Sequence, residues 1–153
     1  MTEDDLPQFG TYMDGIDYIE RISVYGIAIN PVGQVLVCKR TMERIVLPGG
    51  GVDGDEDLLQ ALHREISEET GHRVTGERLL FRARQYHAHR RRKPPANKLC
   101  HFYRVELEFD PAIEKEDDHE PVWLPLHRLT HSMTFESHAW AIERAISEQQ
   151  RNG

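Results

Sequence analysis

Hydrophobic residues are grouped along the chain in short runs separated by turn residues. Residues 18–29 are rich in β-branched and aromatic side chains, and residues 34–38 form a similar run. Both runs are typical of strands, and the turn sequence Asn30-Pro31-Val32-Gly33 between them predicts a hairpin. The same criteria predict four further strands, at residues 45–47, 79–87, 99–109 and 121–124.

Two other segments have the hydrophobic period of a helix. Apolar residues recur on one side of residues 55–70, where Asp55 is the predicted N-cap and Gly71 the C-terminal stop. A second helix is predicted over residues 134–147. Residues 49–54 contain four glycines and predict a flexible loop without a regular element. Because strands and helices alternate, we expect an α/β fold with helices packed on a mixed sheet.

Size, charge and cysteine content narrow the class of protein. The 153 residues suit one domain, which we place at residues 18–150, after a polar N-terminal arm at residues 1–17. The net charge of −7 argues against general nucleic-acid binding, which depends on neutralising phosphates. No apolar run approaches the ~18 residues of a membrane span, and the acidic N-terminus does not resemble a signal peptide. Cys38 and Cys100 exclude a disulfide scaffold. Two buried thiols in a cytoplasmic protein are expected, with a single bridge as the alternative.

The first predicted helix carries a cluster of acidic residues. Glu65, Glu68 and Glu69 are spaced i, i+3 and i+4, so they project from one face and repel one another. A hard divalent cation such as Mg²⁺, which prefers oxygen ligands, would compensate for this repulsion. The glycine-rich backbone just before the helix can approach a ligand closely. The alternative for the three glutamates alone is a solvated acidic face.

The surrounding spacing makes the acidic cluster more specific. The stretch reads Gly50-x5-Glu56-x7-Arg64-Glu65-Ile66-x-Glu68-Glu69-x-Gly71. This pattern resembles the Nudix box, G-x5-E-x7-R-E-U-x-E-E-x-G-U, in which U is aliphatic, and it covers the 23 residues from Gly50 to His72. Two positions depart from the family pattern. His72 stands where an aliphatic residue is usual, and Asp55 stands where the family usually has glycine. Neither departure removes a carboxylate.

The resemblance implies a fold and an activity. It implies a Nudix-type α/β/α sandwich with a mixed sheet and two main helices. It also implies a Mg²⁺- or Mn²⁺-dependent hydrolase that cleaves a nucleoside diphosphate linked to another moiety. By the family's pattern, the metal ligands are the carboxylates of Glu65, Glu68 and Glu69 and the main-chain carbonyl of Gly49. The general base varies within the family, and here the candidates are Glu65, Glu69 and a loop carboxylate outside the box, for which we name Glu120.

Several neighbouring residues have expected roles beside these ligands. Arg64 is expected to orient a neighbouring carboxylate, since a guanidinium can hold one in a fixed geometry. Glu56 faces away from the other glutamates on a helical wheel, so a structural role is expected for it. For Glu120 the alternative is a surface acidic loop. We expect its neighbours Glu116, Asp117 and Asp118 to be exposed to solvent.

The positive charge is concentrated in one segment. Residues 82–98 contain seven lysines and arginines and no acid, so this segment could receive substrate phosphates. Arg84 is the predicted substrate-binding residue here, together with Gly50 and Gly51 in the glycine-rich segment. For the tip at residues 90–93, a solvated hairpin loop is the favoured interpretation. His87 and His89 alternate in a predicted strand; a zinc pair is conceivable there, and ordinary strand histidines are the favoured alternative.

The resemblance leaves several substrates and functions open. The first candidates for the substrate are a (d)NTP and a nucleotide sugar such as ADP-ribose, ahead of dinucleoside polyphosphates and capped RNA ends. A Nudix-like domain that binds a nucleotide without hydrolysing it is the alternative class. The complete set Glu65, Glu68 and Glu69 favours an enzyme. Isomerisation of a prenyl diphosphate would call for a catalytic cysteine, and no motif surrounds either cysteine. A homodimer is an assembly that the resemblance suggests.

Overall fold

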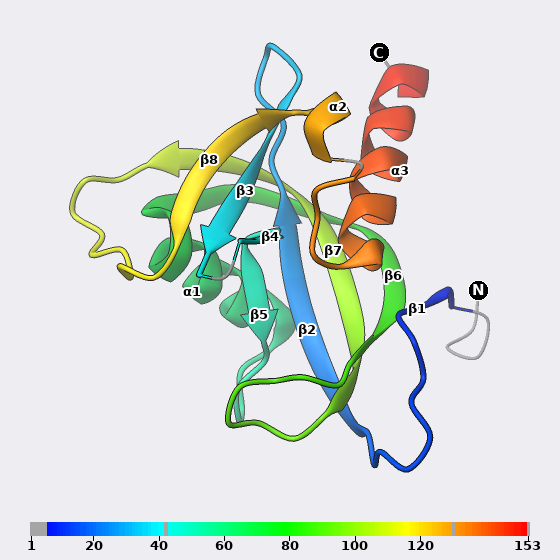
Figure 1. Ribbon diagram of the computed structural model, residues 1–153. Coiled ribbons are helices and arrows are strands. Elements are labelled where there is room, and N and C mark those ends of the chain that lie inside the picture. Colours follow the sequence, from blue (N-terminus) through cyan, green and yellow to red (C-terminus); the bar gives the residue numbers. More distant parts are fainter. Residues whose placement is uncertain (1–5, 42, 130, 153) are drawn as a thin grey trace.

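A computed structural model describes residues 6–41, 43–129 and 131–152. Its strands form two sheets (Figure 1). The five-stranded sheet has the order β1 (Gln8–Phe9), β6 (His72–His87), β7 (Ala96–Phe109), β2 (Ile19–Ile27) and β5 (Gly49–Gly51), and the three-stranded sheet has the order β4 (Arg44–Val46), β3 (Gln34–Arg40) and β8 (Glu120–Pro125). The helices are α1 (Leu58–Thr70), α2 (Leu126–Leu129) and α3 (Glu136–Asn152).

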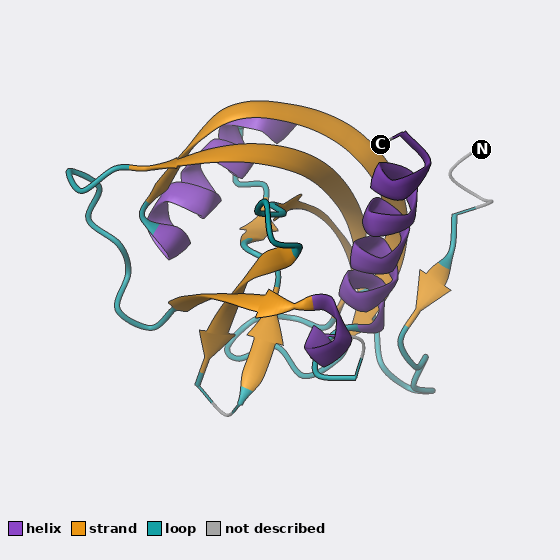
Figure 2. Ribbon diagram, turned by 90° about the horizontal axis from the view of Figure 1, so that it is seen from above, coloured by secondary structure: helices purple, strands orange, loops and turns teal. Residues whose placement is uncertain are grey.

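The larger sheet is mixed. Strand β7 pairs with β6 in antiparallel and with β2 in parallel orientation, and β5 runs antiparallel to β2. Figures 1 and 2 show strands between the two long helices, α1 and α3. The expected α/β/α sandwich with a mixed sheet and two main helices is therefore confirmed, and the short α2 is an addition to it. None of the helices in the described ranges is long and apolar enough to span a membrane.

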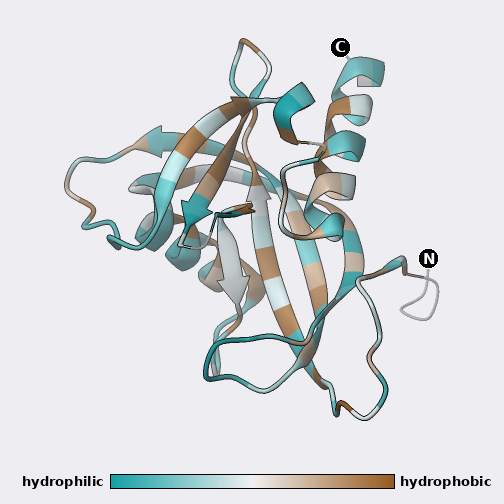
Figure 3. Cartoon of the chain, viewed as in Figure 1, coloured by the Kyte–Doolittle hydropathy of each residue, from teal (hydrophilic) through white to brown (hydrophobic). Residues whose placement is uncertain are grey.

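Two hydrophobic cores lie on opposite faces of the strands. Successive side chains of a strand point to opposite faces, so Val24 of β2 packs in the core beneath α1, while Tyr25 and Ile27 pack in the core beneath α3. The banding of β2 and β7 in Figure 3 reflects this alternation. Gly26 allows the close packing of α1, because a Cβ there would lie 2.6 Å from Cδ1 of Ile66. Helix α1 is thus held close to the sheet, with its carboxylates at one edge of the core.

Helix α1 begins three residues later than predicted. Its N-cap is Asp57, not Asp55, and the Asp57 carboxylate accepts a hydrogen bond from the Gln60 amide at 2.8 Å. The Gln60 side chain in turn accepts from the Asp57 amide at 2.9 Å, which completes a capping box. This reciprocal pair needs the acid and the glutamine three residues apart, and Asp55 has no such partner. The predicted stop at Gly71 is confirmed, with a left-handed φ of 72°.

The predicted hairpin forms only next to its turn, where the Asn30 amide donates to the Gln34 carbonyl at 2.9 Å and the Leu36 amide to the Ala28 carbonyl at 3.1 Å. The Asn30 side chain accepts hydrogen bonds from the amides of Val32 and Gln34 at 3.2 and 2.8 Å. Beyond one isolated bridge, between Ile29 and Val35, the chain separates into two sheets. Strand β3 pairs with β4 and β8, whereas β2 pairs with β5 and β7. Turn residues specify the reversal of the chain, and they do not specify which partner each strand takes.

The glycine-rich segment is not the irregular loop that its composition predicts. Gly49–Gly51 form β5 and pair with Tyr25, Val24 and Ser23 of β2. A Cβ on Gly49, whose φ is 147°, would lie 2.0 Å from the Val24 carbonyl oxygen. Glycine is therefore required here for close approach of two backbones. Strand β6 also starts earlier than predicted, at His72, directly after α1, and α3 extends to Asn152 instead of ending at residue 147.

Part of the predicted N-terminal arm is docked on the domain. Residues 8–9 form β1, which pairs in parallel with Arg84 and Gln85 of β6. The Phe9 ring packs on Trp140 of α3, with ring centroids 5.4 Å apart. Residues 1–5 of the arm lie outside the described residues. The docked part lies at the edge of the larger sheet beyond β6, so it takes no part in the site formed at β5 and α1.

The two cysteines are buried and are not bonded to each other. Cys38 lies on β3 and Cys100 on β7, and both thiols are free, with neither residue exposed to solvent. Burial raises the pKa of Cys100 to about 12 and also raises that of Cys38. The expectation of two buried thiols is confirmed.

Candidate active site

A cleft of about 480 Å³ opens beside α1. Strand β5 and the carboxylates of α1 line one part of it, and the loop between β6 and β7 lines another. Its lining also includes Tyr25 and Leu47 from the core beneath α3. The cleft is therefore bounded by the Gly50 to His72 segment on one side and by the basic segment of residues 82–98 on the other.

The three glutamates of α1 lie at the cleft with different degrees of exposure. Glu69 is buried, the Glu65 side chain is 17% exposed and that of Glu68 is 40% exposed. Strand β5 lies directly against them, since a Cβ on Gly50 would be 2.8 Å from the Glu65 carboxyl carbon. The Gly49 amide points at Glu69 and lies 3.4 and 3.5 Å from its two carboxylate oxygens. The structure thus brings together all three glutamates and all three glycines that the sequence singled out.

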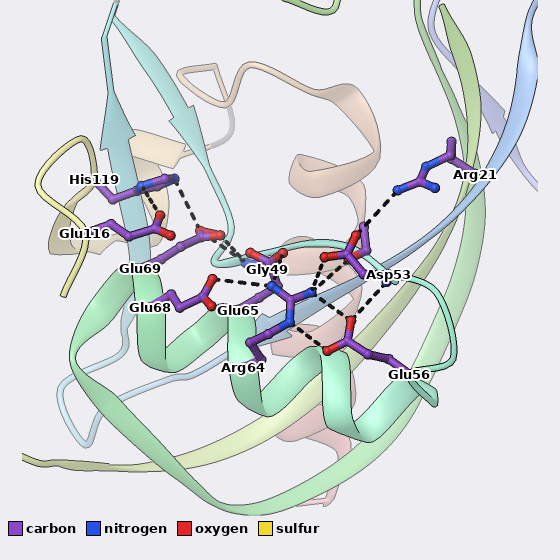
Figure 4. A network of polar contacts seen from close by, with 11 residues as sticks. Arg21, Gly49, Asp53, Glu56, Arg64, Glu65, Glu68, Glu69, Glu116 and His119 are labelled. Atoms are coloured by element: carbon purple, nitrogen blue, oxygen red, sulfur yellow. Dashed lines mark hydrogen bonds and ion pairs between the residues drawn. The ribbon is translucent and has the colours of Figure 1, made fainter. Parts of the chain in front are cut away.

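Arg64 lies at the centre of the acidic cluster (Figure 4). Its guanidinium donates two hydrogen bonds to Glu56, at 2.6 and 2.8 Å, one to Glu65 at 3.1 Å and one to Glu68 at 3.3 Å. A further hydrogen bond, at 3.3 Å, reaches the Gly51 carbonyl. The hydrogen bonds from Arg64 lower the pKa of Glu56 to about 2. This geometry agrees with the expected structural role of Glu56 and with Arg64 as the residue that orients its neighbours.

Glu69 is the carboxylate whose charge is least compensated. Burial, followed by the charge of Glu65 and a hydrogen bond with it, raises the pKa of Glu69, and the Gly49 amide opposes this only in part. Arg64, which contacts Glu65 and Glu68, makes no hydrogen bond or ion pair to Glu69 among the described residues. Two nearby carboxylates in a poorly solvated position favour a proton or a cation between them. The donor set of glutamate oxygens beside a main-chain carbonyl fits a hard divalent ion.

A second group of side chains reaches the same cleft from the segment before β8. His119 is 5% exposed, and its Nε2 lies 3.6 Å from the nearer Glu69 oxygen. Its Nδ1 lies 2.9 Å from Asp118 and 3.5 Å from Glu116. Candidate ligand atoms of these three residues lie within 4.8 Å of one another. The Glu116 amide donates to the Glu68 carbonyl at 2.7 Å, which fixes this segment against α1.

The acidic residues that reach the cleft from this segment precede Glu120 by two and four positions. Glu120 is exposed, lies opposite Lys39 in the β3–β8 pairing and is not among the residues that line the cleft. Glu116 and Asp118, although exposed as expected, do line it. Glu116 and Asp118 belong to the segment before β8, whereas Glu120 is the first residue of that strand. Without the register, nothing in the acidic run distinguishes these positions.

The structure also separates Arg84 from the acidic cluster. Arg84 lines a different pocket, beside Tyr18 and Tyr86, and its guanidinium lies 4.0 Å from Glu20. The loop tip is exposed at residues 91–93, as expected, and it also lines the cleft through Arg90, Arg91 and Lys93. Arg84 lies next to Gln85, which is buried, and successive residues of β6 face opposite sides of the sheet. The sequence therefore identifies the basic segment, but it does not show on which face of the sheet each side chain lies.

The buried floor of the cleft includes a histidine that sequence reasoning missed. His138 of α3 is 1% exposed and accepts a hydrogen bond from the Leu47 amide through Nδ1, at 3.1 Å. Burial and the positive charges of Lys98 and Arg44 lower the pKa of His138 well below its usual value. The ring is therefore neutral and, because Nδ1 accepts, its proton is on Nε2. In the sequence, the only signal for the burial of His138 is its place among apolar residues in a predicted helix.

A comparison with known protein families identifies the family that shares this fold and this sequence motif. The family model of the NUDIX domain matches residues 20–145. This match covers most of the chain, so the protein belongs to the Nudix family. A search of curated proteins gave no match.

Solved structures of similar fold belong to the same family. A NUDIX hydrolase from Nitrosomonas europaea superposes with a TM-score of 0.68 and 18% identity, over 84% of this chain and 90% of the other. The MutT NUDIX hydrolase from Burkholderia pseudomallei gives 0.65 and 25%, over 81% and 96%. The MutT protein from Methanosarcina mazei Go1 gives 0.66 and 22%, over 88% and 99%. The Nudix fold is thus shared at low sequence identity.

Proposed function

We propose that the protein is a Mg²⁺- or Mn²⁺-dependent pyrophosphohydrolase that cleaves a nucleoside diphosphate linked to another moiety. The observation that carries this proposal is the convergence of Glu65, Glu68 and Glu69 with the Gly49 backbone at one end of a cleft. Membership of the Nudix family supports hydrolysis as the type of reaction. A purely nucleotide-binding module would not need three glutamates kept close together against their mutual repulsion.

Different residues of the site are assigned to metal binding and to proton transfer. Glu65, Glu68 and Glu69, with the Gly49 carbonyl, would hold divalent ions, which neutralise the diphosphate and make water a better nucleophile. Arg64 orients Glu65 and Glu68 through hydrogen bonds, so these two are the better fixed ligands. Glu69, which has no arginine partner and a raised pKa, is the stronger candidate for the general base, with Glu65 as the alternative. Glu116 takes the position of the loop carboxylate for which the sequence suggested Glu120.

The first substrates to test are a (d)NTP and a nucleotide sugar such as ADP-ribose. The structures of similar fold are MutT proteins and NUDIX hydrolases, and these names specify no substrate. Gly50 and Gly51 of β5 allow the Glu65 carboxylate and the Arg21 guanidinium to lie close against the backbone at the cleft. We further propose a cytoplasmic location and, as one assembly to test, a homodimer.

The test is a screen of nucleoside diphosphate derivatives with Mg²⁺ or Mn²⁺, in which a coupled phosphatase releases phosphate from the products. We expect turnover of at least one compound and its loss in excess EDTA, because carboxylates alone cannot neutralise a diphosphate. Restoring the metal should restore the rate. Full turnover in EDTA would contradict the metal site. Binding of a nucleotide without turnover under every metal condition would favour the non-catalytic module.

A further inference from the structure

The end of the cleft opposite α1 is strongly basic. Its cations come from two strands and a loop: Arg44 lies on β4, Lys98 on β7, and Arg90, Arg91 and Lys93 on the loop between β6 and β7. None of these five residues has a carboxylate within ion-pair distance in the described part of the chain. Arginines elsewhere on the sheet are paired, as Arg73 is with Glu108 and Arg78 with Glu148. A protein with a net charge of −7 therefore leaves a group of unpaired cations in one cleft.

Specific contacts hold the side chains at the basic end in place. Lys98 Nζ lies 4.8 Å from the centre of the Phe135 ring, and the Arg44 guanidinium carbon lies 5.5 Å from the same centre. One aromatic ring thus holds two cations side by side. Arg90 donates to the Pro94 carbonyl at 2.7 Å, which closes the loop, and Arg91 and Lys93 line the cleft from that loop.

Holding these cations together has an energetic cost. Burial is the main cause that lowers the pKa of Lys98, to about 8, and the charges of Arg90, Arg44 and Lys93 add to it. His87, between these cations, is driven neutral by burial and by Lys98, with its pKa lowered to about 3. Its Nδ1 is buried without a hydrogen-bond partner. Folding alone does not favour such a cluster, so an anionic ligand that compensates for it is the simplest reason for its presence.

The strand register offsets the backbones of the two ends along β2. Gly49, beside the α1 carboxylates, lies opposite Tyr25 of β2, whereas Lys98 lies opposite Arg21 of the same strand. Arg21 and Tyr25 are four residues apart and on the same face, which corresponds to about 13 Å along the strand. This span is longer than one diphosphate group. A diphosphate bound at the carboxylates would leave the basic end free for another part of the same molecule.

We propose that the basic end binds a second phosphate group of the substrate, remote from the diphosphate that is cleaved. The preferred substrates are then nucleoside diphosphate derivatives that carry an additional phosphate. This inference rests on the proposed function for the identity of the scissile bond. Arginine and lysine together suit a phosphate dianion, because it accepts several charge-assisted hydrogen bonds at once. A neutral base or sugar would leave the cations without compensation.

The hydrolytic test compares matched substrates that differ in the remote phosphate. The pairs are ADP-ribose with its 2′-phosphate, and diadenosine diphosphate with diadenosine pentaphosphate. In at least one pair we expect kcat/KM to be about tenfold or more higher for the compound with more phosphates, since a hydrogen bond between charged groups is stronger than one between neutral groups. The double variant Arg91→Gln/Lys93→Gln should reduce this ratio by a similar factor. Arg92→Gln is the matched control, because Arg92 is in the same loop and does not line the cleft.

A binding measurement separates this inference from the proposed function. Isothermal titration in EDTA compares adenosine 3′,5′-bisphosphate with AMP, so neither metal nor turnover is needed. We expect the bisphosphate to bind about tenfold more tightly, and the advantage to be lost in the double variant and kept in Arg92→Gln. Tighter bisphosphate binding without hydrolysis of any compound would overturn the proposed function alone. Equal rates in both pairs together with equal binding would overturn the remote phosphate site, as would equal losses in the variant and its control.

Discussion

Glu69 differs from its two neighbours on α1 because it is buried and has no arginine partner. If it is the general base, Glu69→Gln should lower kcat by at least about 10²-fold, as is typical for loss of such a group. Glu56→Gln should lower kcat less, because Glu56 acts only through Arg64. Steady-state kinetics of both variants measures this difference, and circular dichroism checks their folds. Equal losses of kcat would contradict the separate roles assigned to Glu69 and Glu56.

Lys98 illustrates the cost of an unpaired cation at the residue level. Its pKa, lowered to about 8 from 10.5, means that the unfolded chain binds more protons between these values. The free energy of unfolding contributed by this residue therefore rises with pH over that window. Lys98→Met, which keeps the contact with Phe135 and removes the charge, should raise the free energy of unfolding at pH 7 by about 1–3 kcal/mol.

Urea denaturation of wild type and Lys98→Met at pH 7 and pH 10 measures this effect. The advantage of the variant should shrink at the higher pH, where wild-type Lys98 is neutral in the folded state. Lys93→Met provides the comparison, since Lys93 is exposed and its removal should change stability little. A variant no more stable than wild type at pH 7 would contradict the cost that burial imposes on Lys98.

At the level of elements, the start of α1 decides where the carboxylates lie. The capping box at Asp57 and Gln60 fixes the first turn, and the helix then places Glu65, Glu68 and Glu69 one to two turns later at β5. Asp57→Ala should lower the free energy of unfolding by about 1 kcal/mol, as is typical for an N-cap. Asp55 lies two residues earlier, outside the capping box, so Asp55→Ala should change the free energy of unfolding by less than about 0.5 kcal/mol. Thermal or urea denaturation of the two variants distinguishes Asp57 from Asp55 as the cap.

The same level shows how far the sequence can predict the site. The position of the three α1 carboxylates on one face can be predicted from their spacing alone, because a helix fixes which residues share a face. Strand positions are harder, since a shift of one residue moves a side chain to the other face. Residue type predicts Glu120 and Arg84 within the right segments, but neither residue lines the cleft. The pairing of β5 with β2 is a contact between distant segments, so the glycine run alone could not reveal it.

For the whole molecule, buried His138 and half-buried His87 predict a loss of stability in acid. The pKa of His138 is lowered by burial, and that of His87 is lowered to about 3. Below about pH 6.5 the unfolded chain protonates both while the folded chain does not, so each reduces the free energy of unfolding as pH falls. The slope is up to about 1.4 kcal/mol per pH unit for each histidine.

The measurement is urea denaturation at pH 7 and pH 5 for wild type and His138→Asn, in which the asparagine oxygen can still accept from the Leu47 amide. The variant should lose less stability between the two pH values than wild type does. His127→Asn is the control, because His127 is exposed. An identical loss in wild type and His138→Asn would show that His138 titrates normally in the folded state.

The two cores also determine how this protein can be labelled for spectroscopy. Cys38 and Cys100 are fully shielded, and burial disfavours the reactive thiolate form of both. A maleimide or spin label should therefore leave them unmodified as long as the fold is intact. A cysteine introduced at exposed Arg92 would then react selectively without replacement of the native thiols. Such a probe would report directly, by fluorescence or by electron spin resonance, on whether the basic loop changes its environment when a phosphorylated ligand enters the cleft.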